Sequence, residues 1–175
     1  MPTERNLIIR AEKPDDYPAI EAINLQAFGR PVEANLVHAL RLSLPRADYS
    51  RVAVLDGKPV GHILFSPIFI DTDQGAVSAL ALAPMAVLPE VQGRGIGSML
   101  VREGLATLRQ LGERVVVVLG HSDFYPRFGF QTASRYGIQA PFEVPDPAFM
   151  VIELQPDALQ GVQGTVRYPP AFEQA

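Results

Sequence analysis

The sequence predicts a mixed α/β fold with one β-sheet, and three observations support this fold class. Segments typical of strands and helices follow one another along the chain, with no repeat and no linker. Ala76 to Val87 is long and largely apolar, as expected for a strand that is covered on both faces. A glycine-rich turn, Gln92 to Gly97, comes next and opens a helix that Gly112 ends. The predicted order is strand, two helices, three strands, helix, strand, short helix and further strands.

The first part of the chain predicts one strand and two helices. Leu7 to Arg10 is short and apolar, which is typical of a strand. Pro14 to Asp16 starts a helix with acids in its first turn, and Gly29 ends it. A second helix begins at about Val32 and ends at Pro45. The apolar positions expected to face the core are Ile20, Ile23, Leu25 and Phe28 in the first helix, and Leu36, Val37, Leu40 and Leu44 in the second.

The middle of the chain predicts three strands. Arg51 to Leu55 and Val60 to Ile70 flank the turn dipeptide Asp56-Gly57, which indicates a hairpin. Pro84 lies inside the next strand, Ala76 to Val87, and proline cannot donate to a ladder. We therefore expect a bulge or a splay at Pro84, which would leave nearby backbone groups free for a ligand.

The last part of the chain predicts shorter elements. Val115 to Leu119 is a run of apolar residues typical of a buried strand. Gly120 to Arg127 is expected to be a turn with a short helix, and Phe128 to Phe130 starts the next strand region. Phe149 to Leu154 is a late strand. In the tail we expect a small terminal hairpin with Val162, Val166, Tyr168 and Phe172.

Composition places the chain among globular proteins of one domain. Its 175 residues are 47% hydrophobic and 19% charged, so a compact core can form without covalent cross-links. The absence of cysteine excludes disulfides, a thiol nucleophile and thiolate metal ligands. Only three histidines are present and none forms an HExxH pair, so we expect no metal.

Charge and hydropathy argue against two kinds of partner. The formal net charge is -4, and no run of Lys or Arg marks a nucleic-acid surface. Met1 to Arg10 lacks the apolar core of a signal peptide. The longest mostly apolar stretch, Ala76 to Val91, is too short and too interrupted to span a bilayer. We therefore expect a cytoplasmic protein that binds neither nucleic acid nor membrane.

The turn from Gln92 to Gly97 has the features of an anion site. The first N–H groups of a helix have no partner inside the helix, and the helix dipole favours negative charge there. Glycines let the backbone approach a phosphate closely, and Arg94 adds a cation suited to phosphate. A turn of this kind also serves tight packing alone, so the turn does not decide the function by itself.

Two other phosphate-binding patterns fit poorly. A P-loop needs Gly-Lys followed by Ser or Thr, but the only lysines are Lys13 and Lys58, far from the turn. A dinucleotide-binding unit needs GxGxxG and an acid at the end of the next strand. Here the glycines are spaced as Gly93, Gly95 and Gly97, and the next strand is followed by Gly120-His121.

Two motifs together resemble the GNAT superfamily of N-acetyltransferases. Gln92-Gly93-Arg94-Gly95-Ile96-Gly97 matches the family's acetyl-CoA turn, and Leu82 to Val87 is similar to its fourth strand. Tyr125-Pro126-Arg127-Phe128-Gly129-Phe130 resembles its later motif. The likeness covers most of the chain. It is strongest to a bacterial subgroup that shares Arg-Phe-Gly-Phe and a tail with Val-Arg-Tyr-Pro.

The resemblance implies a fold and a cosubstrate. We expect a GNAT domain over residues 1–154, with a mixed, splayed sheet flanked by helices, and a C-terminal extension over 155–175 packed on it. Strands ending near Val87 and Leu119 would splay apart to admit acetyl-CoA. The implied contacts with the pantetheine arm are backbone groups of Met85, Ala86 and Val87. The implied contacts with the pyrophosphate are Gln92, Gly93, Arg94, Gly95, Ile96, Gly97 and Ser98, and Phe128 is a further cofactor contact.

The implied reaction is attack of a neutral amine on the acetyl thioester. Tyr125 is the candidate general acid for the thiolate, because of its position in the family motif. Full proton transfer from a phenol of pKa about 10 to a thiolate whose thiol has a pKa of about 8.5 is uphill by about 2 kcal/mol, so a strengthening hydrogen bond is the easier route. A packing role among neighbouring phenylalanines is the alternative. The Val87 N–H is the implied oxyanion donor.

The general base and the acceptor stay open. Many relatives carry a carboxylate on the fourth strand, but Ala76 to Val87 has none. The candidate bases are Glu33, His62, His121 and Asp123. An acceptor site between the first two helices and the far strands would be lined by Phe28, Glu33, Phe65, Phe142 and Phe149.

The sequence leaves three kinds of function to compare. The first is an acetyltransferase acting on a primary amine of a small molecule or a peptide. The second is a non-catalytic acyl-CoA-binding sensor or partner module, and the third is a purely structural protein. The presence of Tyr125 favours the acetyltransferase, and the lack of a carboxylate in Ala76 to Val87 keeps the non-catalytic module open. A homodimer is a candidate assembly.

Overall fold

The computed structural model describes residues 6–174 and shows one mixed sheet between helices. The strands are β1 (Leu7–Ala11), β2 (Ser50–Leu55), β3 (Lys58–Thr72), β4 (Gly75–Val87), β5 (Val115–Leu119), β6 (Gln131–Thr132), β7 (Ile138–Gln139), β8 (Phe149–Glu153) and β9 (Gly164–Arg167). The helices are α1 (Tyr17–Phe28), α2 (Val32–Arg41) and α3 (Ile96–Gln110). Neighbouring strands in the sheet follow the order β1-β2-β3-β4-β5-β8-β6, and β9 pairs with both β3 and β7. The mixed sheet confirms the predicted fold class, and the succession of helices and strands along the chain confirms the predicted element order.

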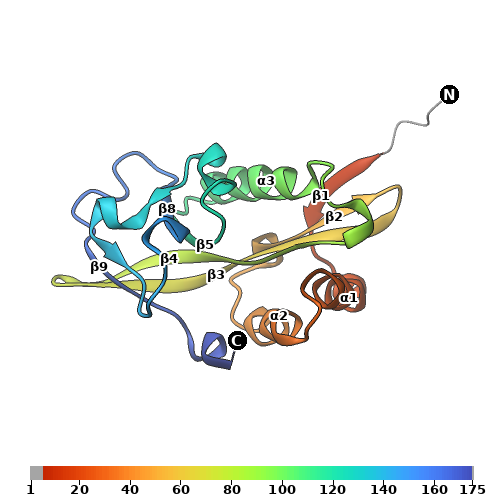
Figure 1. The fold of residues 1–175 in the computed structure, drawn as a ribbon, viewed down its shortest axis with the longest axis horizontal. Coiled ribbons are helices and arrows are strands. Elements are labelled where there is room, and N and C mark those ends of the chain that lie inside the picture. Colours follow the sequence, from red (N-terminus) through yellow and green to blue (C-terminus); the bar gives the residue numbers. More distant parts are fainter. Residues whose placement is uncertain (1–5, 175) are drawn as a thin grey trace.

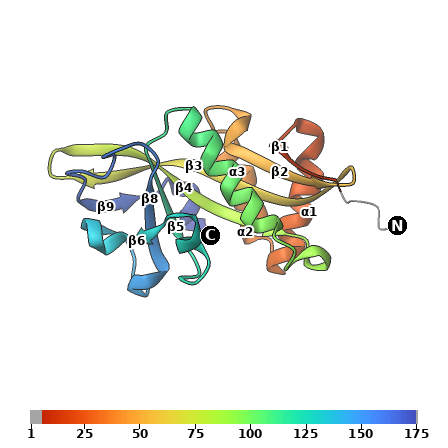
Figure 2. The same ribbon diagram turned by 90° about the horizontal axis from the view of Figure 1, so that it is seen from above.

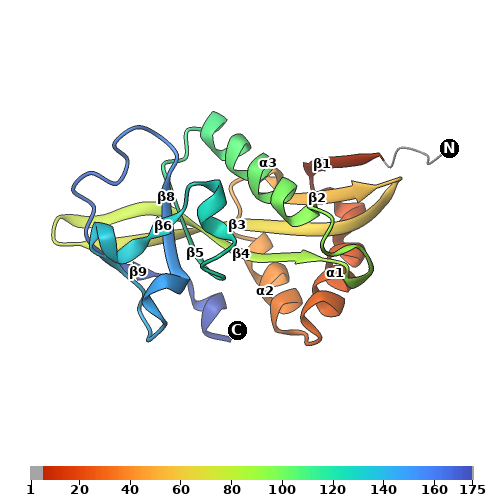
Figure 3. The same cartoon turned by 45° about the horizontal axis from the view of Figure 1, so that its top comes forward.

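The helices cover the two faces of the sheet separately. In Figure 1, α3 lies above the strands, whereas α1 and α2 lie below them. Two clusters of buried side chains correspond to this arrangement, one containing Leu100 and Leu108 of α3 and the other Ile20 and Leu40 of the α1–α2 pair. A third cluster lies under the later strands and includes Val166 of β9. Figure 3 shows α3 running across the strands.

Pairing is antiparallel from β1 to β4 and parallel between β4 and β5. β3 and β4 are the longest strands and form a hairpin that projects at one end of the molecule (Figure 2). Opposite Leu64, β4 has two residues, Ala83 and Pro84, because the register shifts between Ile63 and Phe65 of β3. The bulge predicted at Pro84 is therefore confirmed.

Some expectations for the first two helices were wrong. Leu25 and Phe28 do not face the core: they are 37% and 39% exposed, and the buried positions of α1 are Ile20, Ile23 and Asn24. Leu25 is two residues beyond Ile23, which is about half a turn away at 100° per residue. α2 ends at Arg41 instead of at Pro45. The N–H and hydroxyl of Ser43 both donate to the carbonyl of Leu40, which closes the helix early.

The prediction of a small hairpin at the C-terminal end was also wrong. β9 pairs antiparallel with Phe69–Asp71 of β3 and parallel with β7. β4 occupies the other edge of β3 at these residues, so β9 lies on the edge that β2 uses nearer the start of β3. A free sheet edge offers unpaired backbone groups, and the tail fills it instead of pairing with itself. The strand region expected from Phe128 is only the two residues of β6.

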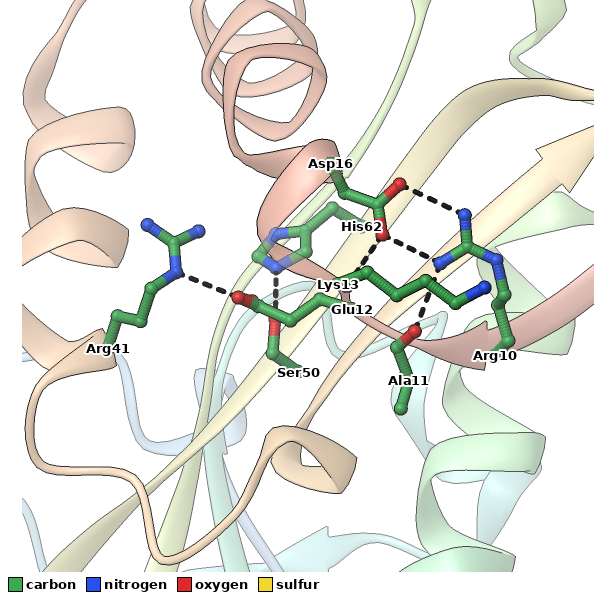
Figure 4. A network of polar contacts seen from close by, with 8 residues as sticks. All are labelled: Arg10, Ala11, Glu12, Lys13, Asp16, Arg41, Ser50 and His62. Atoms are coloured by element: carbon green, nitrogen blue, oxygen red, sulfur yellow. Dashed lines mark hydrogen bonds and ion pairs between the residues drawn. The ribbon is translucent and has the colours of Figure 1, made fainter.

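A buried polar network ties the N-terminal segment and α2 to the sheet (Figure 4). Arg10 makes two hydrogen bonds with Asp16, from Nη1 to Oδ2 at 2.7 Å and from Nη2 to Oδ1 at 2.9 Å. The Arg41 Nε donates to Glu12 Oε2 at 2.8 Å, and Glu12 is 6% exposed. These contacts fix α1 and α2, and with them the loop that joins the two helices.

His62 of β3 is fully buried beside this network. The Asn24 Nδ2 donates to its Nδ1 at 3.4 Å, so its Nε2–H donates to the Ser50 hydroxyl at 2.8 Å. Burial, with a smaller contribution from the positive charge of Arg41, lowers the pKa of His62 to about 3. The ring is therefore neutral and structural near neutral pH.

The free energy of unfolding should depend on the pH through His62. Between the unfolded pKa of about 6.5 and the folded value of about 3, the unfolded chain binds the extra proton, so stability falls as the pH falls. The slope from this group approaches about 1.4 kcal/mol per pH unit. Urea unfolding of the wild type and of His62→Gln from about pH 7 to pH 5 tests it. The variant should have the shallower slope, and equal slopes would contradict the assignment.

Candidate functional site

The sheet opens between β4 and β5. Only two residue pairs join the strands, Leu80 with Val116 and Ala81 with Val117. Beyond Ala81 the described strands have no further pairs, although β4 continues to Val87. The Leu88 N–H donates to the Val60 carbonyl on the β3 side. Because backbone groups alternate between the edges of a strand, the Val87 N–H points toward the open side.

A hollow of about 550 Å³, the turn hollow, lies between this open edge and the start of α3. It is lined by the ends of α1 and β4, by the glycine-rich turn and by part of the loop after β5. The predicted cofactor residues that line it are Met85, Ala86, Val87, Gln92, Gly93, Gly95, Ile96, Gly97 and Ser98. Arg94 is exposed in the turn and does not line the hollow. Phe128 lies outside it and packs edge-on against Phe124, with ring centroids 5.1 Å apart.

The turn leaves amide groups free to bind an anion. Gly93 and Gly95 have φ values of 76° and 83°, a left-handed conformation that favours glycine. The Met99 N–H donates to the Gly95 carbonyl at 3.1 Å, so the N–H groups of Ile96, Gly97 and Ser98 precede the first helical hydrogen bond. No acidic residue lies in this first turn of α3. The positive end of the helix therefore faces the turn hollow.

Gln92 connects the turn to the open strand. Its side-chain Nε2 donates to the carbonyl of Val87 at 2.9 Å. This carbonyl is on the same edge as the Val87 N–H, the edge that β5 leaves. The side chain of Gln92 thus holds the glycine-rich turn at a fixed distance from the end of β4.

A second hollow of about 560 Å³, the split hollow, fills the gap between β4 and β5. Its floor is formed by residues 81–85 and 117–121, and its walls by the loop between α1 and α2 and by aromatic side chains. It shares Phe28, Met85 and His121 with the turn hollow, so the two hollows adjoin. A long ligand bound at the start of α3 can therefore reach the gap in the sheet.

Tyr125 lines the split hollow from the short helix Tyr125–Phe128. It is 7% exposed and packs edge-on against Phe124 and Phe130, with centroids 5.0 and 5.6 Å away. Burial raises the pKa of Tyr125 to about 12, so the phenol stays protonated at neutral pH. Only glycine fits at position 120, since a Cβ on Gly120 would lie 2.4 Å from the Tyr125 ring. In the sequence, only the place of Gly120 directly after a buried strand distinguishes it.

The structure separates the four candidate bases. Glu33 and His121 line the split hollow. Arg30 Nε donates to Glu33 Oε1 at 2.9 Å, so this carboxylate is already ion-paired. His62 is buried in the network of Figure 4, and Asp123 lines neither hollow.

The expected acceptor residues are only partly brought together. Phe28, Glu33 and Phe142 line the split hollow. Phe65 was wrongly expected there, because its ring is fully buried under α3 against Gly104. Phe149 was also wrongly expected there, since it is 4% exposed and lines a different hollow. Arg30, Tyr168 and Phe172 are among the lining residues that the sequence analysis did not place there.

Two negative findings concern the described residues alone. Within residues 6–174, no three His, Cys, Asp or Glu side chains gather in a way that would hold a metal ion. In the same part of the chain, each helix is too short or too polar to cross a membrane.

Comparison with known proteins identifies the family. The family described as "Acetyltransferase (GNAT) domain" matches residues 47–132. N-acetyltransferase YhbS of Escherichia coli is 35% identical over 172 residues, which cover 95% of this chain and 98% of that protein. N-acetyltransferase YjhQ of Escherichia coli is 40% identical over 133 residues, which cover 75% of this chain and 74% of that protein.

Solved structures agree with this result. The structure of YhbS in complex with CoA has a TM-score of 0.89 and 35% identity, and covers 99% of this chain and 95% of that chain. A GNAT family acetyltransferase from Brucella melitensis in complex with acetyl-CoA has a TM-score of 0.77 and 36% identity, covering 95% and 98%. Since both sequence and fold match along almost the whole length of YhbS, this chain belongs to the GNAT family of N-acetyltransferases.

Proposed function

We propose that this protein transfers the acetyl group of acetyl-CoA to a primary amine of a small molecule or a peptide by direct attack. The observation that carries the proposal is the pair of adjoining hollows along the gap between β4 and β5, one beside free amides and one beside Tyr125. In the reaction the amine nitrogen bonds to the acetyl carbon and the carbon–sulfur bond breaks. The amine loses a proton and the CoA thiolate gains one.

The turn hollow suits the cosubstrate. We place the pyrophosphate at the N–H groups between Gln92 and Ser98, where the helix dipole attracts anions. The pantetheine arm would run along the open edge of Met85 to Val87 like an added strand. The exposed Arg94 is close enough in sequence to meet a phosphate, and Phe128 would contact the cofactor only at its margin. The complexes of YhbS with CoA and of the Brucella melitensis protein with acetyl-CoA support the choice of acetyl-CoA as the cosubstrate.

Substitution of Gly97 tests the cofactor site. A Cβ there would touch the Met85 methyl group at 3.5 Å and the Phe124 ring at 3.9 Å, so the longer side chain of Gly97→Leu would enter the turn hollow. We expect the Kd for CoA to rise by about 10-fold or more, measured by calorimetry. Met99→Leu, an exposed position on the same helix, is the control and should bind CoA normally. Unchanged binding by a folded Gly97→Leu would contradict the placement.

Tyr125 is the proposed donor to the leaving thiolate. With its pKa raised to about 12, full proton transfer to a thiolate whose thiol has a pKa of about 8.5 costs about 5 kcal/mol. A hydrogen bond that strengthens as the sulfur gains charge avoids most of this cost. The Val87 N–H, on the open edge of β4, is the proposed donor to the oxyanion.

Replacement of Tyr125 by phenylalanine should lower kcat by about 100-fold, because the ring stays and only the hydroxyl is lost. The Kd for acetyl-CoA should change little. Steady-state kinetics with an accepted amine, together with calorimetry, measure both quantities. Unaltered turnover would remove Tyr125 from the chemistry.

His121 is the proposed base, acting directly or through water. It lines both hollows, where the amine and the thioester would meet, whereas the carboxylate of Glu33 is neutralised by Arg30. A histidine is suited to proton transfer near neutral pH.

A pair of variants in one loop tests this role. His121→Ala should lower kcat/KM for the amine by about 10-fold to 100-fold, in the range of general base catalysis. Asp123→Ala is the matched control, since Asp123 is also exposed, lies two residues away and lines neither hollow. If both variants lose the same activity, the effect comes from the loop and not from the imidazole.

A non-catalytic acyl-CoA-binding module is the second candidate, favoured by the lack of a carboxylate on β4. Release of CoA from acetyl-CoA that depends on an added amine separates the two candidates. Binding of acetyl-CoA without such release, over a panel of primary amines, would favour the module.

A further inference from the structure

The C-terminal segment, residues 164–174, is built into the sheet. Val166 of β9 is fully buried in the third core cluster. Arg167 makes a two-point ion pair with Asp71 of β3, from Nε to Oδ2 at 2.9 Å and from Nη2 to Oδ1 at 3.2 Å. A Cβ on Gly164 would lie 1.9 Å from the Asp71 carbonyl oxygen, so the strand approaches β3 as closely as only glycine permits. The segment is therefore held in one position.

After β9 the chain crosses to the face that carries α2. The last helical turn, η7 (Pro170–Gln174), lies beside α2 on the side of the sheet opposite α3 (Figures 1 and 3). Phe172 packs against two core clusters, including the one that contains Leu36 of α2. Its ring also lines the split hollow.

Three aromatic rings form one wall of this hollow. The Tyr168 ring stacks on Phe142, with centroids 5.9 Å apart and planes at 21°. The Phe172 ring is tilted against Tyr168 at 4.9 Å. We call Phe142, Tyr168 and Phe172 the aromatic wall. Two of its three members come from the C-terminal segment, and Phe28 and Tyr125 contribute further rings around the same space.

The side chains that line the split hollow offer little unpaired charge with which to bind an anionic ligand. Among the described residues that line it, the only Arg, Lys, Asp or Glu side chains are Arg30 and Glu33, and they pair with each other. The floor from residues 81–85 consists of apolar side chains. Aromatic faces attract apolar groups and tolerate a nearby ammonium. An amine carried on a sugar or on a phosphate-bearing group would find few hydrogen-bonding or ion-pairing partners in this hollow.

We propose that the C-terminal segment is the acceptor-recognition element, and that the aromatic wall selects a primary amine carried on an apolar body of aromatic size. This inference rests on the proposed acetyltransferase function, because it assigns the split hollow to the acceptor. The hollow of about 560 Å³ is in the range of small-molecule sites and leaves room for such a body beside the acetyl group.

Two primary amines of similar size test the selection. With 2-phenylethylamine, the wild type should have a kcat/KM at least about 10-fold higher than with glucosamine, since burying a phenyl ring contributes about that factor or more. Phe142→Ala and Phe172→Ala should reduce this ratio by about 5-fold to 10-fold through the KM of the aromatic amine. The KM for acetyl-CoA should not change. Tyr17→Ala, which removes a similarly exposed ring outside the hollow, should keep the wild-type ratio.

The choice of positions guards against the case in which one variant fails to fold. Phe142 is 48% exposed and outside any helix or strand, so its replacement by alanine should be tolerated even if that of Phe172 is not. Gly164→Ala, which forces β9 away from β3, should raise the same KM without changing acetyl-CoA affinity.

The outcomes separate the inference from the proposed function. If no amine releases CoA from acetyl-CoA, the proposed function is wrong and the inference falls with it. If CoA is released but glucosamine is used as well as 2-phenylethylamine, only the inference is wrong. The same holds if the Phe142, Phe172 and Tyr17 variants behave alike.

Discussion

The two parallel strands β4 and β5 stop hydrogen bonding after Ala81, and every part of the site depends on this gap. Pro84, which carries no N–H, lies beyond the last residue of β4 that pairs with β5, in a two-residue bulge opposite Leu64. On β4, the gap leaves the Val87 N–H without a ladder partner on that side. It also brings the start of α3, with its free amides, next to the open edge, so that the turn hollow and the split hollow join.

The helices α1 and α2 on one face of the sheet hold side chains in place at the split hollow, and their buried polar network takes no proposed part in the reaction. The buried contacts of Glu12 with Arg41 and of Asp16 with Arg10 fix both helices, and their connecting loop places Phe28 and Glu33 at the split hollow. Buried ion pairs are costly unless they are well hydrogen-bonded, so their value here is in fixing an arrangement. His62 belongs to this framework, and its low pKa reflects burial and not a catalytic task.

The tail uses an edge of β3 that β2 leaves free beyond Leu64. Through this pairing, Tyr168 and Phe172, which are far from the glycine-rich turn in sequence, line the split hollow that adjoins the turn hollow. If the proposed acceptor site is right, a change of Tyr168 or Phe172 that keeps the fold would alter acceptor preference and leave the turn hollow, which neither residue lines, intact. Under the proposed function, the turn hollow would hold the cosubstrate and the aromatic wall of the split hollow would contact the acceptor.

The sequence by itself determined the fold class, the bulge at Pro84 and the residues around the glycine-rich turn, because these depend on local chemistry: proline lacks a donor, glycine tolerates a positive φ, and a helix start has free amides. The aromatic wall was decided only by the tertiary structure. Phe65 and Phe172 are both phenylalanines in apolar surroundings, and nothing local shows that one lies under α3 while the other lines the split hollow. The need for glycine at position 120 has the same origin, since the ring that excludes a Cβ belongs to Tyr125 and reaches it only through the fold. Long-range packing makes these choices, and the pattern of one strand or helix does not contain it.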